Sequence, residues 1–342
     1  MPTKNQVTRS RPLVIGITLG DINGIGPEVA VQAAFRKRPT GVRVVLIGDP
    51  ATIVREARRL RKPPPRAWAP DQSSVPSHVV TIWNPTPDAR VRRQPGRCTA
   101  PAARAAYEWI VAATAAAQRG ALDAIVTAPI SKEGFMKADV DVPGHTELLA
   151  QLTSTDRYEM MLLADDFRVV LATRHVPIRL VASMLTPNGI RQAIEMTADA
   201  LQWLGCRRKR IAVCGLNPHA GDGGAIGDEE QRIIGPAIRA AKRKGVQLTG
   251  PVPADSVFRQ VRRGAYDAVL AMYHDQALAP FKMVAFEKGV NLTLGLPIIR
   301  TSPDHGTAYA LAGKGKADPS SMMEAVRLAA RLAGRTNPWR RP

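Results

Sequence analysis

Three histidines lie at the ends of apolar stretches that are typical of β-strands. His175 ends VVLATRH, His219 ends IAVCGLNPH and His274 ends AVLAMYH, in a chain with six histidines. A single histidine in such a place is ordinarily a core or capping residue, but three indicate a common role. Neutral imidazoles without neighbouring cysteines suit zinc or a similar divalent ion that keeps a coordination position open. Such an ion can polarise a substrate oxygen, and Asp275 is placed to orient the imidazole of His274.

Groups that bind anions follow His274 along the chain. Lys282, Asn291 and Arg300 come at intervals of eight, nine and nine residues. An ammonium group, an amide and a guanidinium fork can together bind a phosphate or a carboxylate. The alternative is that all three are solvated surface groups.

A second candidate for anion binding lies in PGHTE (143–147). Proline and glycine predict a turn there, and the helical run ELLAQL follows. Donors from His145 and Thr146 at the start of a helix favour an anion. Thr146 is also a plausible helix N-cap, which is its structural alternative.

The elements that must position these residues alternate in type. Apolar strand-like runs occur at 13–19, 42–48, 78–83, 123–130, 167–175, 209–219 and 266–275, and Ala-rich helical stretches such as 102–118 separate them. This alternation predicts α/β architecture with a largely parallel sheet covered on both faces. Ligands of such sheets gather beyond the carboxyl ends of the strands, where the histidines lie.

The first strand runs into a glycine-rich turn, GDINGIGPE (20–28), that opens a predicted helix. Its amides could approach an anion at the helix N-terminus. The turn lacks the GxGxxG spacing, although Asp49 lies where a ribose-binding acid is found in dinucleotide folds. A tight structural turn is therefore an equal alternative to dinucleotide binding.

The composition is that of a basic protein without membrane or disulfide signals. The chain has 342 residues, with 48 Lys and Arg against 29 Asp and Glu, a net charge of +19. The basic runs, such as RRKR (207–210), are scattered and not interleaved with aromatic residues. They favour a solvated surface over nucleic-acid binding. Three cysteines without CxxC spacing favour reduced thiols and a cytoplasmic location, and no apolar run is long enough to span a membrane.

Seven stretches together resemble one family, the 4-hydroxythreonine-4-phosphate dehydrogenases of vitamin B6 biosynthesis. They are ITLGDINGIGPEV, VTAPISK, GHTELLA, LNPHAGDGGAIGDEE, GPVPADSVF, AMYHDQALAPFK and GVNLTLGLPIIRTSPDHGTA. The resemblance implies a two-lobed, three-layer α/β/α fold with largely parallel sheets, similar to isocitrate and isopropylmalate dehydrogenases. Residues 1–130 with 302–342 are expected to form the first lobe. Residues 131–301 are expected to form the second, with the metal ligands and the dimer contacts. The resemblance also implies that the glycine-rich turn at 20–28 is structural and does not bind a dinucleotide.

The resemblance also implies roles for single residues. The family's metal ligands match His175, His219 and His274. Its substrate contacts match His145, Thr146, Lys282, Asn291 and Arg300. The proton-transfer group stays open between Lys282, Asp275, Asp255 and water on the metal ion.

The implied activity is oxidation of 4-hydroxy-L-threonine 4-phosphate to the 3-keto acid by NAD or NADP. Decarboxylation to 3-amino-2-oxopropyl phosphate follows, in pyridoxine 5'-phosphate biosynthesis. The implied ion is zinc, with cobalt or magnesium as alternatives. The implied partner is a second copy, in a homodimer whose active site at the subunit interface takes histidines from both chains.

Two departures from the family pattern leave the substrate open. The first turn reads DINGIG where many members have DPAGIG, and SKEGF follows TAPI in a region that varies among relatives. A related dehydrogenase of a four-carbon sugar-acid phosphate or of a cis-dihydrodiol carboxylate is therefore an alternative. A basic nucleic-acid-binding protein is the alternative from a different class.

Overall fold

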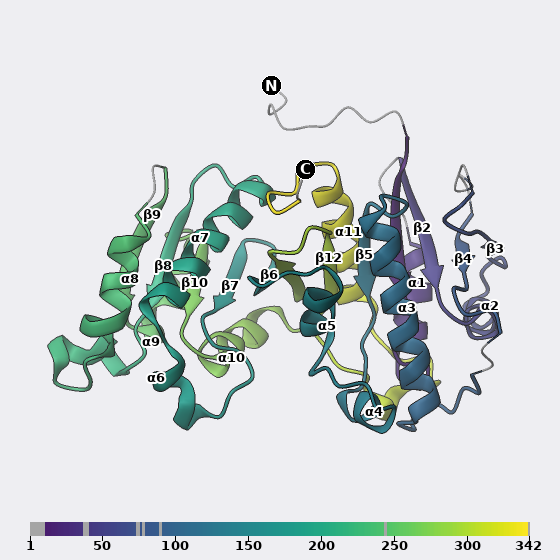
Figure 1. Cartoon of the computed structure of the whole chain (residues 1–342), viewed down its shortest axis with the longest axis horizontal. Coiled ribbons are helices and arrows are strands. Elements are labelled where there is room, and N and C mark those ends of the chain that lie inside the picture. The colour runs from purple at the N-terminus through teal and green to yellow at the C-terminus, as the bar shows by residue number, and fades with distance from the viewer. Residues whose placement is uncertain are drawn as a thin grey trace. The chain divides into compact units, whose positions relative to one another are not determined.

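The structure is a computed structural model that describes residues 11–36, 41–72, 76, 79–88, 91–242 and 245–340. The chain divides into two compact units (Figure 1). The first unit comprises Met1–Tyr158 with Leu296–Pro342, and the second comprises Glu159–Gly295.

The first unit contains a parallel sheet. Its strands are β1 (Leu13–Thr18), β2 (Val42–Ile47), β3 (Arg66–Ala67), β4 (Thr81–Trp83), β5 (Ala124–Thr127) and β12 (Arg300–Pro303). They follow the order β3-β4-β2-β1-β5-β12, and all of the described pairings are parallel. Both faces of β2 and β5 are almost wholly buried, as expected of parallel strands covered on two sides.

Two groups of helices pack on this sheet. One group contains α1 (Gly26–Ala34), α2 (Pro50–Arg59) and α11 (Ser320–Ala333). The other contains α3 (Ala100–Gln118), α4 (Lys132–Lys137) and α5 (His145–Leu152), in which α3 contacts both shorter helices. The short turn η4 (Tyr309–Leu311) completes the unit.

The second unit contains a mixed sheet. Its strands are β6 (Glu159–Ala164), β7 (Phe167–Leu171), β8 (Arg210–Cys214), β9 (Gln247–Val252), β10 (Ala268–Ala271) and β11 (Val290–Leu294). The order is β11-β6-β7-β10-β8-β9. β6 runs antiparallel to both of its neighbours, whereas β7, β10, β8 and β9 are parallel to one another.

The helices of the second unit cover the two faces of its sheet. They are η1 (Ile178–Leu180), α6 (Val181–Met184), α7 (Pro187–Leu204), η2 (Pro218–Gly224), η3 (Glu230–Ile234), α8 (Gly235–Ala240), α9 (Ala254–Arg262) and α10 (His274–Ala285). α9 and α10 pack on the strands through one hydrophobic cluster, in which the rings of Phe167 and Phe281 stack at 5.8 Å. α7 packs with α8 and with the sheet.

The predicted α/β class with largely parallel strands is confirmed. Seven strand predictions coincide with β1, β2, β4, β5, β7, β8 and β10, although β4 begins only at Thr81 and residues 77–78 lie outside the described part. No strand was predicted at β3, β6, β9, β11 or β12; β6 is an antiparallel hairpin strand, which does not fit the expected alternation of strands and helices. In the part of the chain that the structure describes, no helix combines the length and apolarity needed to cross a bilayer.

The division between the units differs from the predicted lobe boundaries at 130/131 and 301/302. Residues 131–158 belong to the first unit because α4 and α5 pack on α3. Residues 296–301 also belong to it because β12 pairs with β5. Sequence periodicity shows where strands lie but not which neighbour a connecting helix packs against, so such boundaries are difficult to predict.

Candidate functional site

Four neighbouring parallel strands of the second unit lead into residues that the sequence singled out. His175 follows β7, His274 follows β10, His219 follows β8 and Asp255 follows β9. Because β7, β10, β8 and β9 are adjacent and parallel, their carboxyl ends share one edge of the sheet. This is the edge at which open α/β sheets bind ligands.

The rings of His175 and His274 lie together. Their centroids are 5.5 Å apart, with an angle of 45° between the ring planes. Nδ1 of His274 lies 2.7 Å from Oδ1 of Asp275. This contact favours the tautomer with the proton on Nδ1, so the lone pair of His274 is on Nε2.

His219 lies on a strained turn after β8. Residues 219–223 have φ values of 53°, 58°, 82°, 44° and 67°, and three of the five are not glycine. Left-handed backbone costs each L-residue about 1–2 kcal/mol. His219 is exposed, and the described residues contain no group of three His, Cys, Asp or Glu side chains that could hold a metal ion. The chain therefore brings two of the predicted ligands together, while His219 as the third stays a prediction.

Glu230 holds this turn in place. Its Oε1 accepts hydrogen bonds from the backbone amides of Leu216 and Asn217, both at 2.7 Å. Its Oε2 accepts one from Nδ2 of Asn217 at 2.9 Å. A Cβ atom on Gly221 would lie 2.7 Å from the same Oε2, so this glycine is required by close approach as well as by its φ. The sequence prediction missed Glu230, whose only signal was an acidic pair ending a glycine-rich stretch.

Three other predicted residues lie on separate elements of the second unit. Asn291 is the second residue of β11, opposite Leu162 of β6. Its Oδ1 atom is buried and has no hydrogen-bond partner among the described residues. Nζ of Lys282, on α10, lies 5.6 Å from the ring centroid of Phe286. Asp255 is exposed in the first turn of α9.

Arg300 is the centre of a buried group in the first unit. It begins β12, opposite Ile125 of β5, and only 2% of it is exposed. Its Nε and Nη2 atoms donate to Oγ1 of Thr127 at 3.1 and 2.8 Å. Thr127 is the last residue of β5, so the polar end of the TAPISK segment meets the predicted anion-binding arginine.

His145, the first residue of α5, belongs to the same group. Burial lowers the pKa of His145 well below its ordinary value, and the positive charge of Arg300 acts in the same direction. Burial also lowers the pKa of Arg300 to about 10, which Glu147 opposes. Near neutral pH the group therefore combines a neutral imidazole with a charged guanidinium. Nε2 of His145 is buried and has no hydrogen-bond partner in the described part of the chain.

Thr146 lies in the first turn of α5, and the N-cap of this helix is Gly144. The alternative interpretation of Thr146 as the N-cap was therefore wrong. Sequence reasoning did not single out Thr127 or Glu147 as site residues, although both stand inside motifs that it quoted. Their contribution depends on Arg300, which comes from a distant strand.

The glycine-rich turn of the first unit is structural. The backbone amides of Asp21, Gly24 and Ile25 donate to carbonyl groups of the protein at 2.9, 3.0 and 2.9 Å. A Cβ atom on Gly20 would lie 2.3 Å from the carbonyl oxygen of Pro129. These three amides are already used, so the turn does not have the open anion site of a dinucleotide fingerprint.

Replacing Glu230 with glutamine should destabilise the protein by about 1–3 kcal/mol, because an amide nitrogen would face a donor in a buried site. The adjacent change Glu229→Gln is the matched control, since Glu229 is less buried and accepts one bond, from Asn217 at 2.8 Å. Urea unfolding of both variants measures the difference. Equal losses would contradict the role given to Glu230.

The lowered pKa of His145 predicts a pH dependence of stability. In the unfolded chain the imidazole of His145 takes up a proton near pH 6.5, whereas in the folded chain it does so only at a lower pH. The free energy of unfolding should therefore fall on acidification, by at most about 1.4 kcal/mol per pH unit from this group. The His145→Gln variant has no imidazole at this position, so its free energy of unfolding should fall less on acidification. Unfolding curves between pH 7 and 5, with a chelator present, test it, and parallel stability profiles would contradict it.

Comparison with known proteins identifies the family. The chain matches the family model described as pyridoxal phosphate biosynthetic protein PdxA over residues 41–329. It is 44% identical over 325 residues to the 4-hydroxythreonine-4-phosphate dehydrogenase of Desulfosudis oleivorans, covering 93% of this chain and 95% of the relative. It is 40% identical over 330 residues to the D-threonate 4-phosphate dehydrogenase of Pectobacterium atrosepticum, covering 94% and 99%.

A solved structure agrees with these relatives. The crystal structure of 4-hydroxythreonine-4-phosphate dehydrogenase from Klebsiella pneumoniae aligns with a TM-score of 0.83 at 40% identity, covering 96% of this chain and all of that one. All three similar proteins are named as dehydrogenases, which are oxidoreductases. The family suggested by the sequence motifs is thus confirmed, and the chain belongs to the PdxA family of pyridoxal phosphate biosynthetic proteins.

Proposed function

We propose that this protein oxidises 4-hydroxy-L-threonine 4-phosphate with NAD or NADP and then decarboxylates the 3-keto acid. The observation that carries the proposal is a pair of unsatisfied buried atoms. His145 Nε2 and Asn291 Oδ1 have no hydrogen-bond partner among the described residues. Both belong to the residues that match the family's substrate contacts. A buried polar atom without a partner is costly, and a bound substrate would remove this cost.

The groups around these atoms fit an anionic substrate. Arg300 is held by Thr127, so its planar fork is already ordered before an anion arrives. The neutral His145 can donate or accept a hydrogen bond without adding charge. We assign Arg300, His145, Thr146 and Asn291 to the phosphate and carboxylate of the substrate, and Lys282 to a contact with the reacting hydroxyl. Binding energy from these groups would orient the reacting carbinol.

The histidines fit a divalent ion. Two imidazoles bound to one tetrahedral zinc ion, with Zn–N distances near 2.0–2.1 Å, have ring centroids about 5 Å apart. The observed separation of His175 and His274 is 5.5 Å. We propose that both hold zinc, or cobalt or magnesium in its place, and that His219 completes the ligand set. Such an ion would stabilise negative charge on the substrate oxygen during oxidation and decarboxylation.

Proton transfer is assigned to one of three side chains. Asp275 is hydrogen-bonded to His274, so it is better placed to orient that imidazole than to take a proton from the substrate. Asp255 is exposed at the start of α9, whereas Lys282 is half-buried. We therefore favour Lys282 as the group that takes the hydroxyl proton.

We propose that the protein works as a homodimer with its active site at the subunit interface. The second unit exposes large apolar side chains on η1, α6 and the end of α10. They include Ile178 at 69%, Met184 at 51%, Met283 at 83% and Phe286 at 68% exposure. Such exposed apolar groups are usual at subunit contacts. The described cysteines form no disulfide, and we propose a cytoplasmic location for the protein.

A second substrate is supported by the relative named D-threonate 4-phosphate dehydrogenase, at 40% identity. The two candidate substrates differ at C2, where 4-hydroxythreonine phosphate has an ammonium group and threonate phosphate a hydroxyl. Glu147, in the first turn of α5, is the carboxylate of the described group around Arg300. A carboxylate there favours the ammonium-bearing substrate, since opposite charges attract.

Reduction of NAD and NADP, measured with each of the two substrates and zinc, tests the proposal. We expect a higher kcat/KM for 4-hydroxy-L-threonine 4-phosphate, with release of CO2. Arg300→Lys should raise KM at least about tenfold, because a lysine loses the bidentate contact with phosphate. Arg239→Ala, at an exposed arginine, is the control and should leave KM unchanged. Turnover of threonate phosphate alone would select the second substrate.

Zinc affinity tests the metal assignment without any substrate. His175→Ala and His274→Ala should each weaken zinc binding at least about 100-fold, and Asp275→Asn about 10- to 100-fold through loss of imidazole orientation. His305→Ala removes a histidine that the proposal does not use, and it should bind zinc as the parent does. Titration against a chromophoric chelator measures all four. Unchanged affinity in the His274 variant would refute the assignment.

A further inference from the structure

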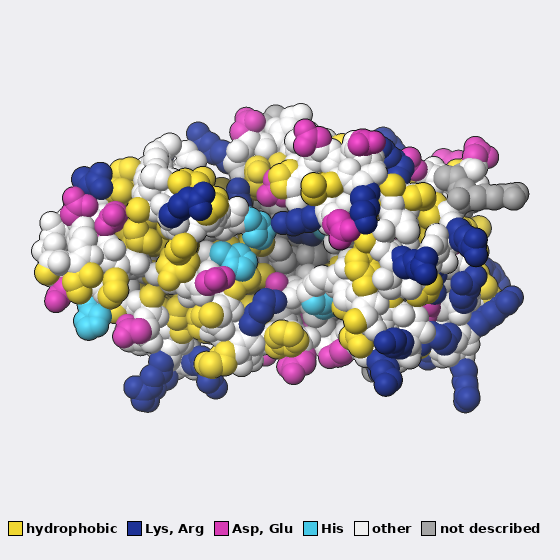
Figure 2. Space-filling model, turned by 90° about the horizontal axis from the view of Figure 1, so that it is seen from below, with side chains coloured by type: hydrophobic (Ala, Val, Ile, Leu, Met, Phe, Trp, Pro, Cys, Tyr) yellow, Lys and Arg dark blue, Asp and Glu magenta, His cyan; other side chains and the backbone are white. Residues whose placement is uncertain are grey.

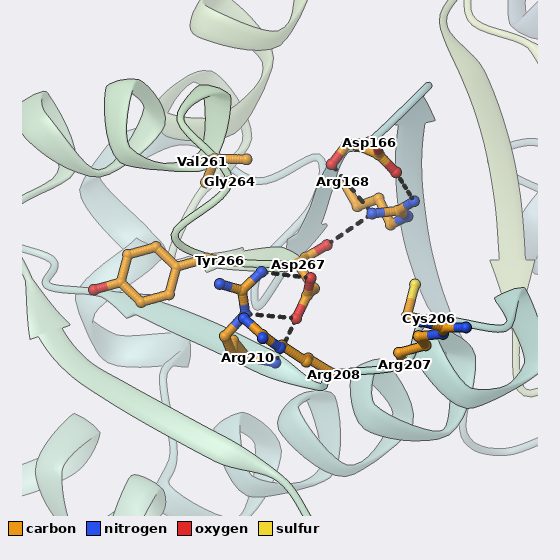
Figure 3. Close-up of a pocket in the computed structure, with 10 residues that line it drawn as sticks. All are labelled: Asp166, Arg168, Cys206, Arg207, Arg208, Arg210, Val261, Gly264, Tyr266 and Asp267. Carbon is orange, nitrogen blue, oxygen red and sulfur yellow. Dashed lines mark hydrogen bonds and ion pairs between the residues drawn. The ribbon is translucent and has the colours of Figure 1, made fainter.

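A pocket lined with arginines lies in the second unit (Figure 3). Its volume is about 380 Å³, within the range of pockets that bind small molecules. Arg210 is the first residue of β8, and Asp267 immediately precedes β10. The pocket therefore lies at the amino ends of strands whose carboxyl ends lead to the histidines. β8 is five residues long, so the pocket at its amino end lies about 16 Å from the carboxyl end that leads to His219.

Two of its four arginines have structural partners. Arg168 is 7% exposed and donates to Oδ1 of Asp166 at 2.7 Å and to the carbonyl of Asp267 at 3.2 Å. Arg210 donates to both carboxylate oxygens of Asp267, at 3.1 and 3.0 Å. Burial would raise the pKa of Asp267, but hydrogen bonds from Arg210 hold it below its ordinary value. These four side chains form an internally neutralised floor, in which the side chain of Asp166 is fully exposed.

Arg207 and Arg208 are different. Both line the pocket and are exposed, and neither makes a side-chain hydrogen bond or ion pair with a residue that the structure describes. Four arginines against two carboxylates leave two positive charges at the pocket, and these two side chains carry them. The pocket differs from the face shown in Figure 2, where lysines and arginines are spread widely among other residues.

We propose that this pocket binds a small anion with two negative charges, of the phosphate or phosphomonoester class. Guanidinium groups bind phosphate oxygens through two parallel hydrogen bonds, and two adjacent arginines offer two such contacts. The carboxylates do not oppose the ligand, because each is already bonded to an arginine of the floor. This site is separate from the proposed substrate site and does not depend on the reaction catalysed there.

Calorimetric titration with inorganic phosphate and adenosine monophosphate, at constant ionic strength, tests the proposal. We expect saturable binding of at least one of these anions, weakened at least about tenfold in Arg207→Ala/Arg208→Ala by the loss of two charged hydrogen-bonding groups. Arg262→Ala/Arg263→Ala is the matched control. It removes the same charge from two exposed arginines of the same unit that do not line the pocket, and it should bind as the parent does.

The Arg300→Lys variant separates this site from the substrate site. Anion binding that survives in Arg300→Lys and is lost in the Arg207/Arg208 variant supports the proposal. Anion binding with the opposite pattern overturns it, and so does an equal loss in the Arg262/Arg263 control. Binding of a single-stranded RNA oligonucleotide without saturable binding of any small anion also overturns it, because the partner would then be a nucleic acid.

Discussion

The burial of parallel strands on both faces is the constraint on which both units depend. β5 in the first unit and β10 in the second are buried along their whole length. Such strands accept few polar side chains in the middle, because an unpaired polar group there is costly. Polar residues are therefore concentrated where the strands end. Thr127, His175 and His274 all occur at such places, so the burial of the strands explains their positions.

The exceptions to this rule are buried polar groups with specific partners. Arg300 is bonded to Thr127, and Glu230 is bonded to the backbone of the turn that carries His219. Each partner offsets part of the cost of burial or of left-handed backbone. The atoms left without a described partner, on His145 and Asn291, are on residues assigned to the substrate. Oγ1 of Thr18, Nε of Arg43 and Nη2 of Arg93 also lack a hydrogen-bond partner among the described residues, so the assignment of His145 and Asn291 to the substrate rests on their match to the family's substrate contacts as well.

The two ends of the second sheet have opposite chemistry. Imidazoles follow the carboxyl ends of β7 and β10, whereas arginines and their carboxylate partners lie at the amino ends of β8 and β10. Cation binding is possible at one edge because imidazole nitrogens can offer lone pairs. Anion binding is favoured at the other because guanidinium groups offer only donors. At least part of the high net charge of the chain therefore lies in a defined pocket, although most basic residues are solvated.

The sequence by itself determined the fold class, most of the strands and the family, because strand burial and helix periodicity are local patterns and the motifs are long. It also identified the histidines, since strand ends can be read from hydrophobicity. Only the tertiary structure decided which residues meet. It paired His175 with His274, joined Arg300 to Thr127 and His145, and gave Glu230 its role at the turn. It also moved residues 131–158 into the first unit. These outcomes depend on strand order and helix packing, which are long-range contacts that a local pattern does not contain.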